Sequence, residues 1–371
     1  MTTNKPAVGI YVHIPYCLSK CVYCGFYSQG GRISQEEEKK YTDSLLTDIS
    51  KASSQYGHRL VDTIFIGGGT PTVFSGDSIR RIIERIKAEF DVTGDAEISC
   101  ESNPGTLSGD KLGAIFDAGI NRLSIGCQSF DDDVLRRLGR VHTAEEFIRN
   151  YEAARQCGFR NINIDLMFSV PLQTEEIWRG TLEQAIRLEP EHISMYSLQL
   201  EEGTRLYRDF KEGRFAENDD ECDRRMYHGA LRLLKDAGYV HYEISNLAKP
   251  GFECRHNEKY WTLSEYIGIG KSASSYIDGK RITNPPFEEY HENTFFDDAS
   301  EYVFTGLRRA DGICFDDFEA KFGKKFWDVF GDRRAEIKPF AGNGDLVLDD
   351  KGIRLTEKGI DISNGIMAIF V

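Results

Sequence analysis

The chain has 371 residues, and its 46 Lys and Arg against 60 Asp and Glu give a formal net charge of −14 at pH 7. Such a charge argues against nucleic-acid binding, which relies on basic side chains to neutralise phosphates. No apolar run approaches the length of a membrane span, the N-terminus has no secretion-signal pattern, and most of the nine cysteines are scattered singly. We therefore expect a cytoplasmic protein without disulfides or a direct membrane anchor.

Short runs of β-branched residues alternate with amphipathic stretches along the first 200 residues. Strands are predicted over Gly9–Ile14, Val61–Ile66, Ala96–Cys100, Arg122–Gly126, Asn161–Met167 and His192–Leu198. Helices are predicted between them over Glu36–Ser53, Ser78–Phe90, Ser108–Ala118, Ala144–Cys157 and Glu175–Leu188. Strands that are each followed by a helix imply an α/β fold with a parallel sheet and right-handed crossovers. Curled up, this sheet is a partial (β/α)6 barrel, whose chemistry is expected at the carboxyl ends of the strands.

Three cysteines follow the first predicted strand in a C-x3-C-x2-C loop: Cys17, Cys21 and Cys24. A 4Fe–4S cluster takes one thiolate per iron, so this loop could hold three corners and leave the fourth iron open. The ligand that usually fills such a corner is S-adenosylmethionine, which a cluster electron cleaves to a deoxyadenosyl radical. A zinc site would need a fourth Cys or His at a matching spacing, and a redox C-x-x-C would not use the third cysteine. The loop therefore predicts an iron–sulfur cluster.

Glycines and polar side chains end several of the other predicted strands. Gly67-Gly68-Gly69 follows the second strand, and glycines let a backbone approach a ligand closely. A tight turn is the alternative explanation. Glu101, Gln128 and Asp165 lie at or just inside the ends of the third to fifth strands. Each could make a structural hydrogen bond, but a ribose, a methionyl carboxylate and an adenine edge would use such groups.

Several motifs occur in order over nearly the whole chain: Tyr11-Val12-His13-Ile14-Pro15, the cysteine loop, Gly67-Gly68-Gly69-Thr70-Pro71, the Gln128 segment, Arg140-Val141-His142-Thr143 and Asp165–Thr174. Together they resemble radical S-adenosylmethionine proteins of the oxygen-independent coproporphyrinogen III oxidase family. The resemblance implies cluster ligation by Cys17, Cys21 and Cys24. It also implies contacts to S-adenosylmethionine from Tyr11, Gly68, Gly69, Thr70, Glu101, Gln128, Arg140 and Asp165.

Three features make the chain most similar to the haem-chaperone group of that family. Oxidase members have a cysteine two residues after the third ligand, where this chain has Phe26, and they carry a longer N-terminal lead. The segment His256–Trp261 is similar to the H-N-x-x-Y-W signature of the chaperone group. The imidazole of His256 could bind haem iron, with Cys254 as the rival ligand, or His256 could cap a loop while the neighbouring aromatic side chains fill a core under the barrel. One departure is Ser274, where family members usually have a histidine.

The chain divides into three predicted parts: a barrel with the cluster loop over residues 1–200, a barrel extension with the H-N-x-x-Y-W segment over 201–284, and a C-terminal lobe over 285–371. In the lobe, helices are predicted over Tyr302–Leu307, Phe315–Phe322 and Phe326–Phe330, and a hairpin is predicted between Leu346–Leu348 and Ile353–Leu355. Helices followed by a hairpin suggest a winged-helix-like α+β lobe. We expect this lobe to cover the mouth of the barrel as a lid.

Two functions follow from these predictions. The first is a haem chaperone that binds a 4Fe–4S cluster, S-adenosylmethionine and haem and delivers haem to acceptor proteins; a homodimer is compatible with this role. The second is an enzyme, oxygen-independent coproporphyrinogen III oxidase, which decarboxylates propionates in porphyrin biosynthesis, and radical-driven haem degradation is a third alternative. Phe26 and the H-N-x-x-Y-W segment favour the chaperone. The residues expected to bind the radical cofactor keep enzyme activity open.

Overall fold

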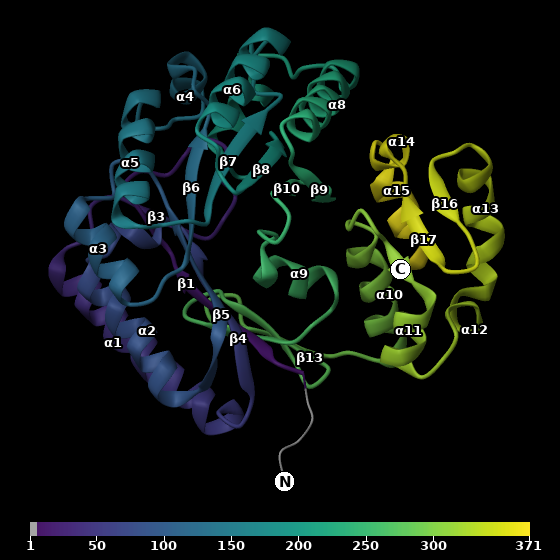
Figure 1. The fold of residues 1–371 in the computed structure, drawn as a ribbon, viewed down its shortest axis with the longest axis horizontal. Coiled ribbons are helices and arrows are strands. Elements are labelled where there is room, and N and C mark those ends of the chain that lie inside the picture. Colours follow the sequence, from purple (N-terminus) through teal and green to yellow (C-terminus); the bar gives the residue numbers. More distant parts are fainter. Residues whose placement is uncertain (1–5) are drawn as a thin grey trace.

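A computed structural model describes residues 6–371 of the chain (Figure 1). The six predicted strands are present as β1 (Val8–Ile14), β4 (Leu60–Gly68), β5 (Asp91–Ser102), β6 (Arg122–Gln128), β7 (Ile162–Phe168) and β8 (His192–Ser197). Neighbours in this series are parallel throughout. The predicted (β/α)6 arrangement is therefore confirmed, and β5 is longer than predicted at both ends.

Five helices connect these strands: α1 (Gln35–Tyr56), α2 (Gly76–Glu89), α3 (Gly109–Asp117), α5 (Ala144–Cys157) and α6 (Glu175–Arg187). The N-cap residue directly before each helix is a serine or threonine. Its side chain accepts a hydrogen bond from the backbone N–H three residues further on. Their apolar faces pack on the sheet, as Leu45, Ile82 and Ile115 do in the main core. Figure 1 shows these helices along the outside of the sheet. The short helix α4 (Asp132–Arg137) was not predicted.

Residues after β8 add short elements that the sequence analysis did not resolve. They are α7 (Arg205–Lys211), α8 (Asp220–Asp236), β9 (Val240–Glu243), β10 (Asn246–Ala248), α9 (Arg255–Trp261), β11 (Tyr266–Ile269), β12 (Ser274–Ile277), β13 (Lys280–Thr283) and β14 (Glu289–Glu292). Within residues 6–371 the main sheet has the order β14-β13-β12-β11-β1-β4-β5-β6-β7-β8-β10-β9. Strand β11 is parallel to β1, whereas the strands beyond β11 and β8 pair antiparallel. The barrel therefore stays open, with an edge strand on each side.

The C-terminal lobe has its own sheet and core. Its elements are α10 (Phe295–Gly306), β15 (Ile313–Cys314), α11 (Phe315–Phe322), α12 (Phe326–Phe330), α13 (Arg334–Gly342), β16 (Leu346–Leu348), β17 (Gly352–Leu355), α14 (Glu357–Ile360) and α15 (Ser363–Met367). The predicted helices and hairpin are present, although α10 begins well before Tyr302. Phe318, Phe326 and Phe330 are almost completely buried in this second core. The domain boundaries given above stay predictions.

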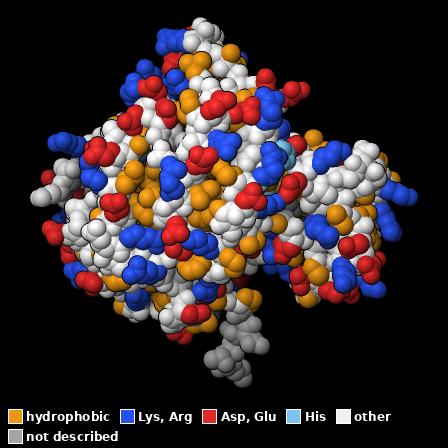
Figure 2. Space-filling model, turned by 45° about the horizontal axis from the view of Figure 1, so that its top comes forward, with side chains coloured by type: hydrophobic (Ala, Val, Ile, Leu, Met, Phe, Trp, Pro, Cys, Tyr) orange, Lys and Arg blue, Asp and Glu red, His pale blue; other side chains and the backbone are white. Residues whose placement is uncertain are grey.

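The lobe joins the barrel beside β9 rather than across the mouth (Figure 1). The Ile244 N–H donates to the Arg308 carbonyl at 3.0 Å, and the Ala310 N–H donates to the Tyr242 carbonyl at 2.9 Å. Figure 2 shows the lobe standing out on one side of the molecule, next to a face whose middle gathers hydrophobic side chains among charges of both signs. Among residues 6–371, no helix is both long enough and apolar enough to cross a membrane.

Candidate functional site

The cysteine loop follows β1 and is anchored along its length. Its ends are joined by β2 (Tyr16–Cys17) and β3 (Gln29–Gly30), which pair in parallel. In its middle, the Val22 N–H donates to the Leu138 carbonyl at 3.2 Å, and the Leu206 N–H donates to the Val22 carbonyl at 2.8 Å. Contacts to the segments after β6 and β8 therefore fix the backbone between the three cysteines.

The three cysteines are half-buried and line one cavity. Burial raises the pKa of the Cys17 and Cys24 thiols, and metals deprotonate the thiols that coordinate them. The Thr70 hydroxyl donates to Cys17 Sγ at 3.5 Å, and Arg140 Nη1 donates to Cys21 Sγ at 3.5 Å. Such donors suit negatively charged sulfur ligands, so these residues fit a 4Fe–4S cluster.

The spacing of the cysteines does not suit a single metal ion. In the part of the chain that the structure describes, no three His, Cys, Asp or Glu side chains come close enough to hold one ion together. A cubic cluster requires a wider spacing, because each thiolate binds its own iron. The three thiolates of the loop would each bind one iron of such a cluster.

A cavity of about 640 Å³ opens at the carboxyl ends of β4 to β8. This volume lies in the range of small-molecule and cofactor sites. All the residues predicted to contact S-adenosylmethionine except Tyr11 line it together with the cysteines: Gly68, Gly69, Thr70, Glu101, Gln128, Arg140 and Asp165. Leu18, Phe26 and Val141 are exposed apolar residues that also line it. The structure therefore brings together side chains that lie far apart in the sequence.

The glycine turn after β4 is packed too closely for larger residues. Gly68 has a φ of 114°, and a Cβ atom there would lie 2.7 Å from the His13 ring. A Cβ atom on Gly69 would lie 2.7 Å from the Tyr16 carbonyl oxygen. Gln128, at the end of β6, has a φ of 66°, which is uncommon for a residue with a side chain. These backbone conformations let the main chain itself line the cavity.

Two half-buried carboxylates line the same cavity. Glu101 accepts a hydrogen bond from the Gly68 N–H at 3.0 Å. Burial, followed by the charge of Asp165, raises the pKa of Glu101 to about 7. Burial also raises the pKa of Asp165, whereas hydrogen bonds from Ser124 and Asn163 lower it. A cationic ligand would favour the ionised form of both carboxyl groups.

Asn103 connects two of the predicted site residues and was not singled out from the sequence. Its Nδ2 donates to the Thr70 hydroxyl at 2.7 Å, and its Oδ1 accepts from Arg140 Nη2 at 2.5 Å. Arg140 Nη2 also donates to the Gly126 carbonyl at 2.7 Å. The only sequence signal was the position of Asn103 in the segment that follows Glu101.

Tyr11 does not line the cavity. The His13 ring lies between the Tyr11 hydroxyl, 3.0 Å from Nδ1, and the Tyr27 carbonyl, 3.2 Å from Nε2. Because a carbonyl can only accept, Nε2 carries the proton and Tyr11 donates to Nδ1. Tyr11 therefore supports the ring that packs against Gly68.

His256 and Cys254, the predicted haem ligands, are fully buried. They line neither the cavity beside the cysteine loop nor a second cavity, which lies next to the C-terminal lobe. His256 Nδ1 lies 2.9 Å from the Thr63 hydroxyl, and Nε2 lies 3.0 Å from the Tyr260 hydroxyl. Burial lowers the pKa of His256 to about 3. Haem ligation by His256 stays a prediction, and it would require this core to open. Ser274 is exposed on β12, away from both cavities.

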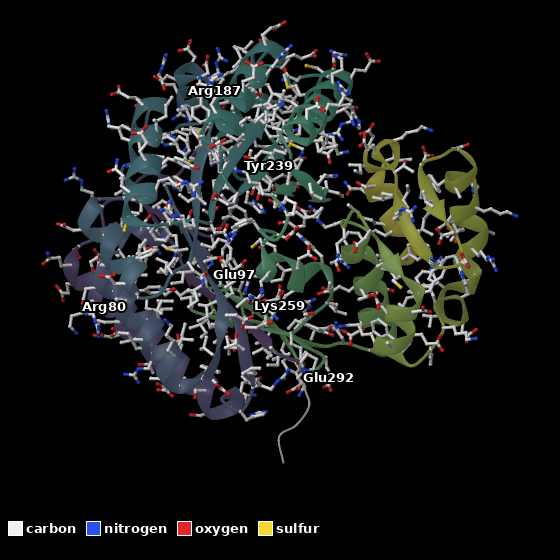
Figure 3. All side chains as sticks on the ribbon, in the orientation of Figure 1. Arg80, Glu97, Arg187, Tyr239, Lys259 and Glu292 are labelled. Atoms are coloured by element: carbon white, nitrogen blue, oxygen red, sulfur yellow. The ribbon has the colours of Figure 1, made fainter. Side chains whose placement is uncertain are left out.

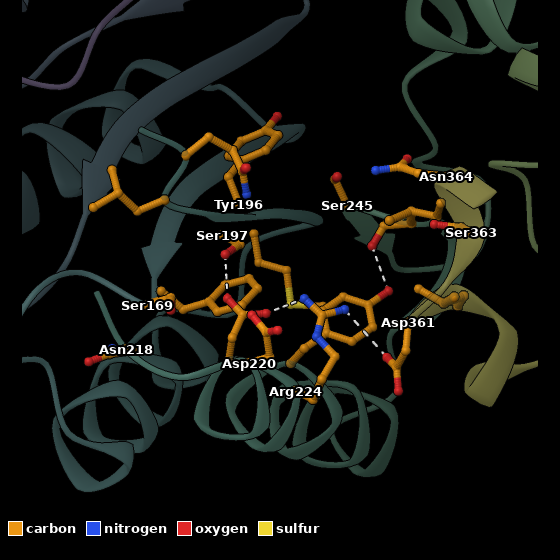
Figure 4. A pocket seen from close by; sticks show the side chains of 18 of the residues that line it. Ser169, Tyr196, Ser197, Asn218, Asp220, Arg224, Ser245, Asp361, Ser363 and Asn364 are labelled. Atoms are coloured by element: carbon orange, nitrogen blue, oxygen red, sulfur yellow. Dashed lines mark hydrogen bonds and ion pairs between the residues drawn. The ribbon is translucent and has the colours of Figure 1, made fainter. Parts of the chain in front are cut away.

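A second cavity, of about 900 Å³, lies between the carboxyl end of β8 and the lobe (Figure 4). Tyr196, Ser197 and Gln199 line both cavities, which are therefore neighbours. The other walls come from α8, from the segment around Ser245 and from residues 360–365 of the lobe. Figure 4 shows Arg224 of α8 reaching Asp361, and their Nη1 and Oδ1 atoms are 3.3 Å apart.

Comparisons with known proteins place the chain in a family. Residues 11–185 match the Radical SAM superfamily, and residues 297–362 match the HemN C-terminal domain. A heme chaperone HemW of Bacillus subtilis is 33% identical over 97% of this chain and 98% of that protein. The chain belongs to the heme chaperone HemW family. The HemW of Escherichia coli is 40% identical over 72% of this chain and 70% of that protein.

The HemW family assignment confirms the resemblance and the radical SAM fold inferred from the sequence. The solved structure of coproporphyrinogen III oxidase (HemN) from Escherichia coli superposes with a TM-score of 0.85 at 25% identity, covering 99% of this chain and 90% of that one. Membership of the radical SAM superfamily implies a 4Fe–4S cluster and S-adenosylmethionine as cofactors. The fit of the cysteine loop to a cluster agrees with this.

Proposed function

We propose that this protein is a haem chaperone that binds haem and passes it to acceptor proteins. The observation that carries the proposal is the likeness, over 97% of the chain, to a protein named heme chaperone HemW. The oxidase alternative is supported by a structural likeness at 25% identity, lower than the 33% to the chaperone. The chaperone function is therefore favoured.

In this proposal the first cavity is the cofactor site. Cys17, Cys21 and Cys24 bind the cluster, and the bound cluster and S-adenosylmethionine supply one-electron cleavage of a carbon–sulfur bond. The carboxylates of Glu101 and Asp165 receive the positively charged groups of S-adenosylmethionine. Arg140 and Asn103 hold Thr70 near the cluster loop. The full set of residues assigned to S-adenosylmethionine is Gly68, Gly69, Thr70, Glu101, Gln128, Arg140 and Asp165, with Tyr11 acting through His13.

The second cavity is the proposed haem site. Its volume of about 900 Å³ suits a macrocycle, and Leu198, Phe215 and Ile244 are among its apolar lining residues. Carboxylates at α8 and Asp361 would repel propionates, and Arg224 is paired with two of them, Asp223 and Asp361. Arg308 also lines this cavity and pairs with one carboxylate, that of Glu243, at 3.3 Å. We therefore assign a propionate to Arg308.

The test of the function uses the anaerobically reconstituted protein with reductant, S-adenosylmethionine and coproporphyrinogen III. Products are followed by mass spectrometry, and haemin is titrated in parallel by absorbance. We expect about one haemin per chain, as one cavity of this size holds one macrocycle, and no protoporphyrinogen. Protoporphyrinogen formed over many turnovers would overturn the chaperone proposal in favour of the oxidase.

The haem site is tested separately by Arg308→Gln, with Arg309→Gln as the matched control. Arg309 is the next residue, pairs with Glu258 at 3.2 Å and does not line this cavity. Loss of a charge-assisted contact predicts haemin affinity about tenfold lower for Arg308→Gln. The Arg309 variant should bind haemin as the wild type does. Equal affinity in both variants would show that this cavity is not the haem site while leaving the chaperone proposal standing.

A further inference from the structure

A line of hydrogen bonds crosses the barrel interior and ends on Asp165. Asn163 Nδ2 donates to Asp165 Oδ1 at 2.8 Å. His192 Nδ1 lies 2.6 Å from Asn163 Oδ1, and His192 Nε2 lies 2.7 Å from the Tyr242 hydroxyl. The Cys254 N–H donates to the Tyr242 oxygen at 3.2 Å. Residues from β7, β8, β9 and the N-cap of α9 are thus connected to the cofactor cavity.

The two ends of this line fix the direction of every bond. A backbone N–H can only donate, and an ionised carboxylate can only accept. The Tyr242 oxygen accepts from Cys254, so its hydroxyl proton points to His192 Nε2. His192 must then carry its proton on Nδ1 and donate it to Asn163. Burial lowers the pKa of His192 well below its usual value, so the ring stays neutral and keeps this tautomer.

The two central side chains of the line, Asn163 and His192, are withdrawn from water. Asn163 is 1% exposed and His192 0% exposed, so water would not readily replace a lost bond. The second amide hydrogen of Asn163 is donated to the Ser124 hydroxyl at 2.8 Å, and Ser124 Oγ donates to Asp165 Oδ2 at 3.0 Å. Both oxygens of the Asp165 carboxylate are therefore held by donors that Asn163 orients.

We propose that His192 and Tyr242 are positioning residues which, through Asn163, hold the Asp165 carboxylate in the orientation that binds S-adenosylmethionine. This inference rests on the contact between Asp165 and S-adenosylmethionine proposed above. Tyr242 donates into this line beside Cys254, which the sequence analysis named as a possible haem ligand. Their place in this line gives both residues a role in the cofactor site.

The first turn of α9 is itself fixed to the barrel. Both Glu97 carboxylate oxygens accept backbone hydrogen bonds, from the Arg255 N–H at 3.1 Å and from the His256 N–H at 3.1 Å. Figure 3 shows Glu97 close to α9 in the centre of the molecule. Since Glu97 is buried on β5, it holds the turn that contains Cys254 in register with the sheet.

The proposal is tested with Tyr242→Phe, which keeps the ring but removes the donor to His192. The matched control is Tyr239→Phe, because Tyr239 is another buried tyrosine (labelled in Figure 3) whose hydroxyl donates to the Pro190 carbonyl at 2.7 Å, outside this line. The dissociation constant for S-adenosylmethionine and the Tm are measured on the reconstituted protein. We expect Tyr242→Phe to weaken binding about fivefold, as for one weakened hydrogen bond to a charge, and Tyr239→Phe to leave it unchanged. Equal affinities would overturn the proposal.

Two further measurements test the tautomer of His192 and the contact of Asp165 with S-adenosylmethionine. Nitrogen NMR of histidine-labelled wild-type protein, with its cluster oxidised, should show His192 protonated at Nδ1 only. An Nε2-protonated or doubly protonated ring would overturn the proposal even if Tyr242→Phe failed to fold. Asp165→Asn separates the contact of Asp165 with S-adenosylmethionine from the positioning of Asp165 by His192 and Tyr242. If Asp165→Asn binds S-adenosylmethionine normally, the assignment of Asp165 and this inference both fail. If it binds weakly and Tyr242→Phe binds normally, this inference alone fails.

Discussion

The Glu101 carboxylate accepts a hydrogen bond from the Gly68 N–H at 3.0 Å and so ties β5 to the glycine turn after β4. The same carboxyl group has its pKa raised to about 7, first by burial and then by the Asp165 charge. Its ionisation therefore changes near neutral pH. In the proposed site this group faces a cationic ligand, so binding and stability respond to its charge in opposite ways.

We expect the affinity for S-adenosylmethionine to fall as the pH decreases from about 8 to about 6. Glu101 becomes neutral as the pH falls through about 7, and a neutral carboxyl group attracts a sulfonium or ammonium group less strongly. The dissociation constant of the reconstituted protein, measured across this range, checks the prediction. Glu101→Gln should bind weakly with a flatter profile, and a flat profile for the wild type would contradict the prediction.

The same substitution is expected to stabilise the protein in the absence of ligand. The pKa of Glu101 is about 7 in the folded protein and about 4.3 in an unfolded chain, so the folded state binds the proton more tightly. Wild-type stability therefore falls as the pH rises from about 4 to about 7. Glutamine keeps an acceptor for the Gly68 N–H without the buried charge. Denaturant unfolding should show a gain of about 2 kcal/mol for Glu101→Gln at pH about 8 and almost none at pH about 4.

Gly68→Ala is expected to damage both folding and the cofactor site. The new Cβ atom would lie 2.7 Å from the His13 ring at a φ of 114°, which should cost about 1–3 kcal/mol. Gly180→Ala is the matched control, since it lies inside α6 with open space around it; there alanine should stabilise the protein by about 1 kcal/mol. Thermal unfolding and cluster absorbance check both variants. Equal effects would show that the turn tolerates a side chain.

Arg140→Gln is expected to lower the reduction potential of the cluster. Arg140 donates to Cys21 Sγ at 3.5 Å, and both its charge and its hydrogen bond stabilise the more negative, reduced cluster. A redox titration followed by electron paramagnetic resonance measures the shift. The control is Arg137→Gln, because Arg137 donates to the Pro171 carbonyl at 3.4 Å and does not line the cavity. A potential that is the same in both variants would argue against this contact.

The barrel was predictable because its strands are long enough to show a recognisable pattern of apolar residues. Buried strands such as β1 and β7 are almost continuous apolar runs between amphipathic helices. The strands from β9 to β14 have only three or four residues each, which is too short for a period to be read. Their pairing depends on long-range register, as in the parallel pairing of β11 with β1.

The residues predicted to contact S-adenosylmethionine lie within local motifs whose chemistry is distinctive, and all of them except Tyr11 line one cavity. Asn103, His192 and Tyr242 were missed because their roles depend on partners far away in the sequence. His192, for example, bonds to Asn163 on one side and to Tyr242 on the other. No spacing in the chain indicates these contacts. The contacts of His256 with Thr63 and Tyr260 were likewise not indicated by the sequence.

His256→Gln tests whether the buried imidazole binds haem. We expect haemin affinity to stay within about twofold of the wild type, because both His256 nitrogens are already within hydrogen-bond distance of Thr63 and Tyr260. The variant should lose about 2 kcal/mol of stability at pH about 7, since those two partners are left without their imidazole. Loss of haemin binding in a folded variant would instead support ligation by His256 and move the haem site into the barrel.

The pH dependence of stability supplies an independent check on His256. Its pKa is about 3 in the folded protein and about 6.5 in an unfolded chain, so its contribution to stability is complete above about 6.5 and is lost as the pH falls toward about 3. Between pH about 7 and pH about 5, the wild type should lose about 2 kcal/mol through this group. His256→Gln lacks this titration, so its unfolding free energy should fall less over the same interval. Parallel pH profiles would mean that the folded protein admits a proton to His256, which a ring closed off by Thr63 and Tyr260 would not allow.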